Sequence, residues 1–75
     1  MSHRPRIREL VQALERLGCR ASRRRRGSHQ KWTTPGGAAM SLVIARPGDE
    51  VSRTVLTHVQ RILRREQLSI DLQAD

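Results

Sequence analysis

The chain has 75 residues, 36% of them hydrophobic, and this length supports one domain over residues 1–75 with a modest core. It contains no apolar run of about 18 residues and no apolar stretch near Met1, which argues against a membrane-spanning helix and a secretory signal and predicts a cytoplasmic protein. The formal net charge of +8 predicts a polyanion or an acidic protein as the partner.

Residues 6–17 are predicted to form an amphipathic helix. Pro5 suits the first turn of this helix, and Gly18 suits the left-handed position that follows a helix end. The apolar residues recur every three or four positions and define one buried stripe, which comprises Ile7, Leu10, Val11, Leu14 and Leu17.

Three strands are predicted next, over residues 19–26, 28–34 and 38–45. Gly27 separates the first two strands, and Thr34-Pro35-Gly36-Gly37 supplies the turn between the second and the third. Residues alternate faces along a strand, so two of the four arginines at 23–26 should point toward whatever covers the sheet. Because burying unpaired arginines is costly, the hairpin tip around Gly27 is expected to project into solvent and to carry His29 with it.

A second helix is predicted from the N-cap Ser52 onward. Its apolar stripe comprises Val55, Leu56, Val59, Ile62 and Leu63. Leu68, Ile70 and Leu72 follow, and Ser69 is expected to cap one further helical turn that covers the edge of the core. The element order αβββα predicts an α+β fold, a three-stranded antiparallel sheet with two helices on one face. Neither helix has the aromatic anchors of a membrane-surface helix, so no membrane partner is expected.

His29 stands directly behind the arginine run and the dipeptide Gly27-Ser28. Arginines bind phosphate regardless of base sequence, and an imidazole exchanges protons near neutral pH. A neutral imidazole could remove the proton from an RNA 2′-hydroxyl that attacks the adjacent phosphorus. The same residues also fit a non-catalytic binding or protein-interaction module, in which His29 contacts phosphate or is simply solvated. From the residues alone, this second interpretation is the commoner one.

Trp32 is the one aromatic residue, and it fits either core packing, which we favour, or stacking on an unpaired base. Trp32 and His29 have opposite parity on one strand, so His29 is exposed if Trp32 is buried. Cys19 is expected to be a small buried hydrophobic residue. The histidines and Cys19 lack the paired spacings of a zinc site, so no metal and no cofactor are predicted.

The order αβββα, with Gly18 after the first helix and Gly27-Ser28-His29 at the first turn, resembles the HicA toxin family. The resemblance extends from about Arg6 to Leu72 and includes Pro47-Gly48 after the third strand and Leu68-Ser69 after the second helix. It implies a double-stranded-RNA-binding-domain-like fold. It also implies a metal-independent mRNA interferase, an endoribonuclease toxin of a type II toxin–antitoxin system.

The resemblance further implies the site and the partners. His29 would be the catalytic general acid or base, and Gly27 and Ser28 would set the turn that presents its imidazole. Arg24, Arg26 and Lys31 would contact the RNA. The partners would be mRNA and a HicB-like antitoxin bound over the active face, with a monomer expected for the free protein.

Four residues depart from the family pattern, in which other residue types are common at these positions. Cys19 replaces an aromatic residue, Arg46 a second histidine, Asp49 a basic residue and Thr54 a glycine. The sequence therefore shows no obvious second histidine that could protonate the leaving 5′-oxygen.

Overall fold

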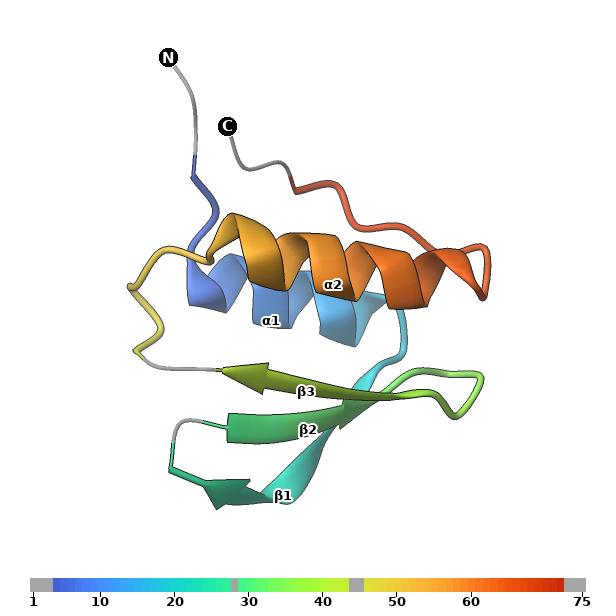
Figure 1. Cartoon of the computed structure of the whole chain (residues 1–75), viewed down its shortest axis with the longest axis horizontal. Coiled ribbons are helices and arrows are strands. Elements are labelled where there is room, and N and C mark those ends of the chain that lie inside the picture. The colour runs from blue at the N-terminus through green and yellow to red at the C-terminus, as the bar shows by residue number, and fades with distance from the viewer. Residues whose placement is uncertain (1–3, 28, 44–45, 73–75) are drawn as a thin grey trace.

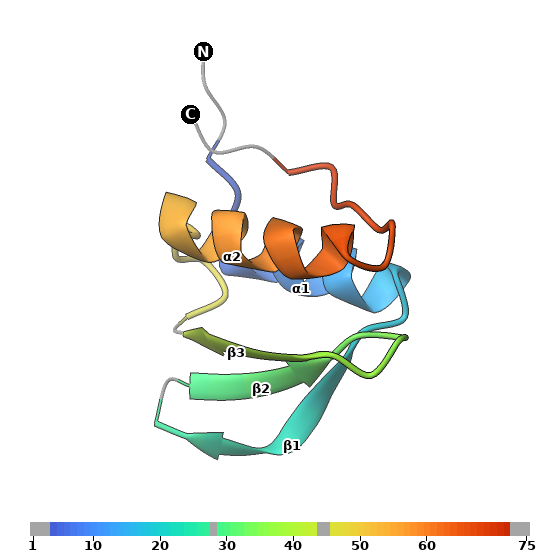
Figure 2. The same cartoon turned by 45° about the vertical axis from the view of Figure 1, so that its right-hand side comes forward.

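The computed structural model describes residues 4–27, 29–43 and 46–72. The helix α1 (Ile7–Arg16) is followed by the strands β1 (Arg20–Arg26), β2 (His29–Thr33) and β3 (Ala39–Val43), and by the helix α2 (Arg53–Arg64). The strands form one antiparallel sheet in the order β1-β2-β3, and both helices lie on the same side of it (Figures 1 and 2). The predicted αβββα fold is therefore confirmed. Ser28, Ile44 and Ala45, which we expected at strand ends, lie outside the described residues.

Helix α1 begins one residue later than predicted, and Pro5 does not lie in its first turn. The N-cap is Arg6, and Pro5 precedes it as a buried residue whose carbonyl accepts a hydrogen bond from the Val51 backbone at 2.9 Å. Arg6 also forms an isolated antiparallel bridge with Glu50. This long-range backbone pairing holds the chain extended up to Arg6, so the helix starts only after it.

The end of α1 follows the prediction made from Gly18. Gly18 has φ +92°, the left-handed conformation that glycine adopts at little cost. The Cys19 backbone donates to the Leu14 carbonyl at 3.0 Å, and the Gly18 backbone donates to the Glu15 carbonyl at 3.0 Å. These two bonds form a Schellman motif, which satisfies the last carbonyls of the helix and directs the chain into β1.

The register of the sheet is regular between β2 and β3 and irregular between β1 and β2. His29 pairs with Val43 and Thr33 pairs with Ala39 without interruption. In contrast, β1 advances four residues from Ala21 to Arg25 while β2 covers two, from Trp32 to Gln30. The Gln30 side chain donates to the Ser22 carbonyl inside this bulge at 3.2 Å. The bulge interrupts the pairing along the arginine run, so the expected alternation of these four residues stays a prediction.

Glu66 joins the end of α2 to the turn between β2 and β3. Its carboxylate accepts hydrogen bonds from the hydroxyl of Thr34, which is 3% exposed, and from the Gly36 backbone at 2.7 Å. The Thr34 hydroxyl in turn accepts a bond from the Ala38 backbone at 2.9 Å. A β-carbon at Gly36 would lie 2.6 Å from the carboxyl carbon of Glu66, so a side chain there would push this carboxylate away from the turn.

Replacing Glu66 with alanine is expected to lower the free energy of unfolding by about 2–3 kcal/mol, because hydrogen bonds to a charged group are lost and a buried hydroxyl loses its acceptor. Urea denaturation followed by circular dichroism measures this loss. Glu15→Ala is the matched control, since Glu15 is an exposed glutamate of α1. An equal and small effect of both changes would show that the Glu66 hydrogen bonds add nothing to stability.

Helix α2 starts as predicted, but the chain after it is not helical. The Ser52 hydroxyl accepts a hydrogen bond from the Val55 backbone at 3.1 Å, which confirms the N-cap. At the other end Gln67 has φ +58°, and the Leu68 backbone donates to the Leu63 carbonyl at 2.9 Å. This second Schellman motif turns the chain away from the helix axis, so the further helical turn predicted at Ser69 does not form.

The tail after α2 nevertheless covers the edge of the core, as expected. Ile70 is buried, and Leu68 and Leu72 pack against the core cluster. The Gln60 side chain donates to the Leu72 carbonyl at 3.1 Å and so fastens the tail to α2. Figure 1 shows the tail running back along the helical layer.

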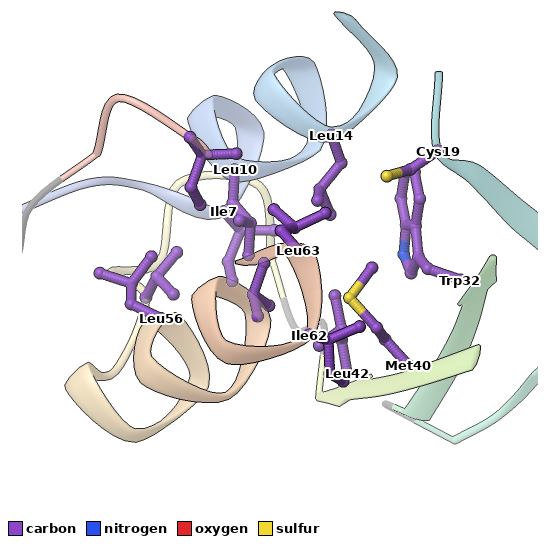
Figure 3. Packing of buried hydrophobic residues seen from close by; sticks show 13 residues of the cluster. Ile7, Leu10, Leu14, Cys19, Trp32, Met40, Leu42, Leu56, Ile62 and Leu63 are labelled. Atoms are coloured by element: carbon purple, nitrogen blue, oxygen red, sulfur yellow. The ribbon is translucent and has the colours of Figure 1, made fainter. Parts of the chain in front are cut away.

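The core lies between the helices and the sheet (Figure 3). Leucines of both helices meet there, and Cys19 lies beside the ring of Trp32. Its buried hydrophobic residues are Ile7, Leu10, Leu14, Cys19, Trp32, Met40, Leu42, Val51, Leu56, Val59, Ile62, Leu63 and Ile70. The side of the sheet that faces the helices is thus packed against the core, and its other side is left uncovered by the helices.

Candidate nucleic-acid interface

The side of the sheet that faces away from the helices is an open, exposed surface. Alternate residues of β2 and β3 lie on it: His29, Lys31 and Thr33 from β2, and Ala39, Ser41 and Val43 from β3. All six are exposed. We call this surface the open face. None of the three strands contains an aspartate or a glutamate, so the charges that the sheet carries are positive.

His29 is the first residue of β2 and lies on the open face. Its neighbour in the register on β3 is Val43, which is 47% exposed and is the one exposed large hydrophobic residue of the described chain. Among the described residues no hydrogen-bond or ion-pair partner orients the imidazole. His29 is therefore accessible to a large substrate, and both ring nitrogens are available for proton transfer or for contacts.

The other predicted site residues lie at different positions relative to His29. Lys31 is two residues further along β2 and exposed on the same face. The backbone of Arg26 pairs directly with that of His29, and Arg24 lies within the irregular part of β1. Gly27 is exposed in the turn with φ +56°, so the turn requires a residue that tolerates the left-handed region. Ser28 lies outside the described residues.

Strand β1 forms one edge of the sheet, which offers a structural explanation for part of the arginine run. An exposed edge strand can pair with another chain, and charged side chains and bulges both oppose such pairing. β1 has both features. The run is thus suited to keeping the edge free as well as to attracting phosphate.

Trp32 belongs to the core and not to the interface. It is 2% exposed, and its indole Nε1 has no hydrogen-bond partner within the described chain. The prediction that Trp32 and His29 lie on opposite faces is confirmed. Base stacking on Trp32 is therefore excluded as a contribution to RNA binding.

Cys19 is a free, buried cysteine, as predicted. Burial, and to a lesser degree the negative charge of Glu66, raise the pKa of its thiol. A thiol with a raised pKa stays protonated at neutral pH and is a poor nucleophile. Cys19 thus fills space beside Trp32 and offers no covalent chemistry.

Two of the departures from the family pattern lie in the loop between β3 and α2. The Arg46 backbone donates to the Asp49 carboxylate at 3.2 Å, and the Asp49 backbone donates to the Arg46 carbonyl at 3.0 Å. The Asp49 carbonyl also accepts a hydrogen bond from the Ile7 backbone at 2.8 Å. Asp49 therefore closes this turn and connects it to the start of α1.

The described residues contain neither a cluster of metal ligands nor a membrane-spanning helix. Within residues 4–27, 29–43 and 46–72, no group of three or more histidines, cysteines, aspartates or glutamates could hold a metal ion. No helix in these ranges is long and apolar enough to cross a membrane.

One cationic surface received no role from the sequence. A shallow groove of about 410 Å³ runs along the exposed side of α2 and is lined by Arg53, Thr54, Thr57, His58 and Arg61. We call it the α2 groove. The apolar period places Arg53, Thr57 and Arg61 on the solvent-facing side of the predicted helix and His58 at its margin. The signal that could have marked this surface is the absence of any acidic residue from α2.

Comparisons with known proteins found one family. Residues 7–68 match the family model described as HicA toxin of bacterial toxin-antitoxin. Neither the curated proteins nor the solved structures gave a match to this chain. The matched range includes both helices and all three strands.

Proposed function

Because the chain belongs to the HicA toxin family of bacterial toxin–antitoxin systems, we propose that it is an mRNA interferase, an endoribonuclease that cuts RNA through His29. The observation that carries this proposal is the exposed imidazole on a sheet face that holds positive charge and no carboxylate. A phosphate chain can approach this face without electrostatic repulsion. No metal ion or cofactor enters the proposed chemistry.

In the proposed mechanism the RNA supplies its own nucleophile. The neutral imidazole of His29 removes the proton from a 2′-hydroxyl, the 2′-oxygen bonds to the adjacent phosphorus, and the bond to the 5′-oxygen breaks. The 5′-oxygen takes a proton from water as it leaves, and the proton held by the imidazole returns to the solvent, which restores the neutral base. Negative charge grows on the phosphoryl oxygens in the transition state, where a positively charged surface stabilises it.

The neighbours of His29 have supporting roles in this proposal. Lys31 lies on the same face and would bind a phosphate next to the cleaved bond. Arg24 and Arg26 would contribute further phosphate contacts, and the pairing of Arg26 with His29 supports this role. Gly27 and Ser28 would form the turn that fixes where β2, and hence the imidazole, begins.

A HicB-like antitoxin is the proposed protein partner. The open face is the natural surface for it to cover, because blocking His29 there would prevent RNA from entering. Val43 offers the antitoxin an apolar contact beside His29. Acidic residues on the antitoxin would complement the positive sheet.

The proposal is tested with purified protein and single-stranded RNA in the presence of a chelator. Cleavage is expected to proceed, since no step needs a divalent metal. RNA with a 2′-deoxy substitution at the cleaved nucleotide is expected to resist, because it lacks the nucleophile. Rapid cutting of the 2′-deoxy substrate at the same bond would contradict the mechanism, and dependence on added metal would contradict the proposed chemistry.

A non-catalytic RNA-binding module is the second candidate, and the lack of an orienting partner for His29 among the described residues favours it. If the chain is such a module, RNA is expected to bind in a salt-dependent way without being cut. The cleavage assay separates the two functions. Growth arrest on expression, relieved by the antitoxin, would support the toxin.

A further inference from the structure

The α2 groove differs in charge from the exposed surface of α1. The exposed residues of α1 include both signs, such as Arg8, Glu15 and Arg16, whereas α2 contains three arginines and no acidic residue. In the described part of the chain the ion pairs join Arg4 and Arg6 to Glu50, and none involves α2. The arginines of α2 are therefore exposed and uncompensated.

Arg53 is also poorly placed for the stability of its own helix. It is the first residue of α2, where the helix dipole is positive, and the first turn holds no acidic residue. A cation at this end is unfavourable, while Arg61 and Arg64 in the last turn are favourable. A residue that opposes local stability is more readily explained by an external partner than by folding.

From this groove we infer that α2 carries a second RNA-binding surface, which holds phosphates of the RNA strand outside the segment that His29 contacts. The inference rests on the proposed function in that it takes RNA as the polyanion. Arg53 and Arg61 are separated by two helical turns, about 12 Å along the axis, so they contact different phosphates. Thr54, Thr57 and His58 lie between them and add hydrogen-bond donors.

The position of the groove allows one RNA strand to reach both surfaces. β2 begins with His29, β3 ends with Val43 and α2 begins with Arg53 at the same end of the molecule in both views (Figures 1 and 2). The open face and α2 lie on opposite sides of the sheet. A strand that leaves the open face at this end would therefore turn around it to meet the α2 groove.

The composition of the groove favours a nucleic acid over a protein. Hot spots at protein interfaces are enriched in Trp, Tyr and Arg that fill desolvated pockets. The groove has two arginines, but no tryptophan, tyrosine or apolar side chain lines it. Val43, the exposed large hydrophobic residue of the described chain, lies on the other side of the sheet. Interfaces with nucleic acid are more polar and more positive, as this groove is.

The test uses the His29→Ala background, so that RNA binds without being cut. Two double variants remove equal charge from exposed helical positions: Arg53→Gln/Arg61→Gln in the groove, and Arg8→Gln/Arg16→Gln on α1 as the matched control. Fluorescence anisotropy measures the affinity for a labelled single-stranded RNA over a range of salt concentrations. The groove variant is expected to make the negative slope of log affinity against log salt shallower by about 1.4, or about 0.7 for each lost phosphate contact.

The control is expected to leave this slope unchanged. Equal slopes for both double variants would overturn the inference, because net charge alone would then account for the effect. An unchanged RNA slope together with weaker antitoxin binding would also overturn it and would assign the groove to the protein partner. In the active protein, the groove variant should raise KM and leave kcat unchanged.

The single variant Arg53→Gln adds a readout that a structural role would not produce. It should weaken RNA binding without lowering the melting temperature, since it removes an unfavourable charge from the helix start. A lower melting temperature would overturn the assignment of Arg53. The outcomes also separate the two proposals. Binding with the expected slope change but no cleavage would refute the ribonuclease alone, and cleavage with an unchanged slope would refute the second surface alone.

Discussion

Replacing His29 with alanine is expected to lower the rate of RNA cleavage by about 100-fold to 10,000-fold, the range typical of losing a general acid or base. His29 is exposed and has no hydrogen-bond partner among the described residues, so the change should cost little stability. Binding should weaken far less than cleavage, because the positive charges of the sheet remain. The comparison therefore requires cleavage rates at saturating RNA together with a binding measurement.

Chemical rescue sharpens this experiment. Free imidazole can diffuse to the space left by an exposed side chain, so adding it to His29→Ala is expected to restore part of the activity. Gln12→Ala, at an exposed position of α1, is the control for a surface substitution on the helical side and should cleave at the normal rate. Undiminished cleavage by His29→Ala would refute the assignment of His29 and would point to another base.

Replacing Trp32 with alanine is expected to lower the free energy of unfolding by about 3–5 kcal/mol, since a large buried side chain leaves a cavity. Small domains have total stabilities of about 5–15 kcal/mol, so this loss should unfold a substantial fraction of the protein. Urea denaturation must be followed by circular dichroism, because Trp32 is the one tryptophan and the change removes the fluorescent probe.

Trp32→Phe is the matched variant for this experiment. It keeps an aromatic ring in the core and removes the indole Nε1, which has no partner in the described chain. We expect it to cost less than Trp32→Ala, because the smaller ring leaves a smaller cavity. RNA affinity should be unchanged in Trp32→Phe. A stable Trp32→Ala variant with reduced RNA affinity would instead show that Trp32 contributes to the RNA interface.

Several features of the fold could be predicted because they depend on local patterns. The three- and four-residue spacing of apolar side chains identified both helices, and Gly18 and Ser52 identified two of their ends. Strand parity predicted that Trp32 and His29 lie on opposite faces of the sheet, as the structure shows. Each of these inferences concerns residues close in sequence, whose geometry the backbone period determines.

The errors arose where residues distant in sequence act on one another. Pro5 was placed in the first helical turn, but pairing with the segment around Val51 keeps it extended. The helical turn expected at Ser69 is replaced by a left-handed Gln67, which lets Leu68 pack against the core. Glu66 had no predicted role, although its carboxylate holds the turn at Thr34 and Gly36.

The sequence by itself determined the αβββα order, the cationic character of the sheet and the exposed position of His29, because side-chain period and charge are properties of the local chain. The tertiary structure alone decided the bulge that interrupts the arginine run and the hydrogen bonds that join Glu66 to the turn at Gly36. It also decided that β2 and α2 begin at the same end of the molecule. These features depend on pairing and packing between segments far apart in the chain, which no local period encodes.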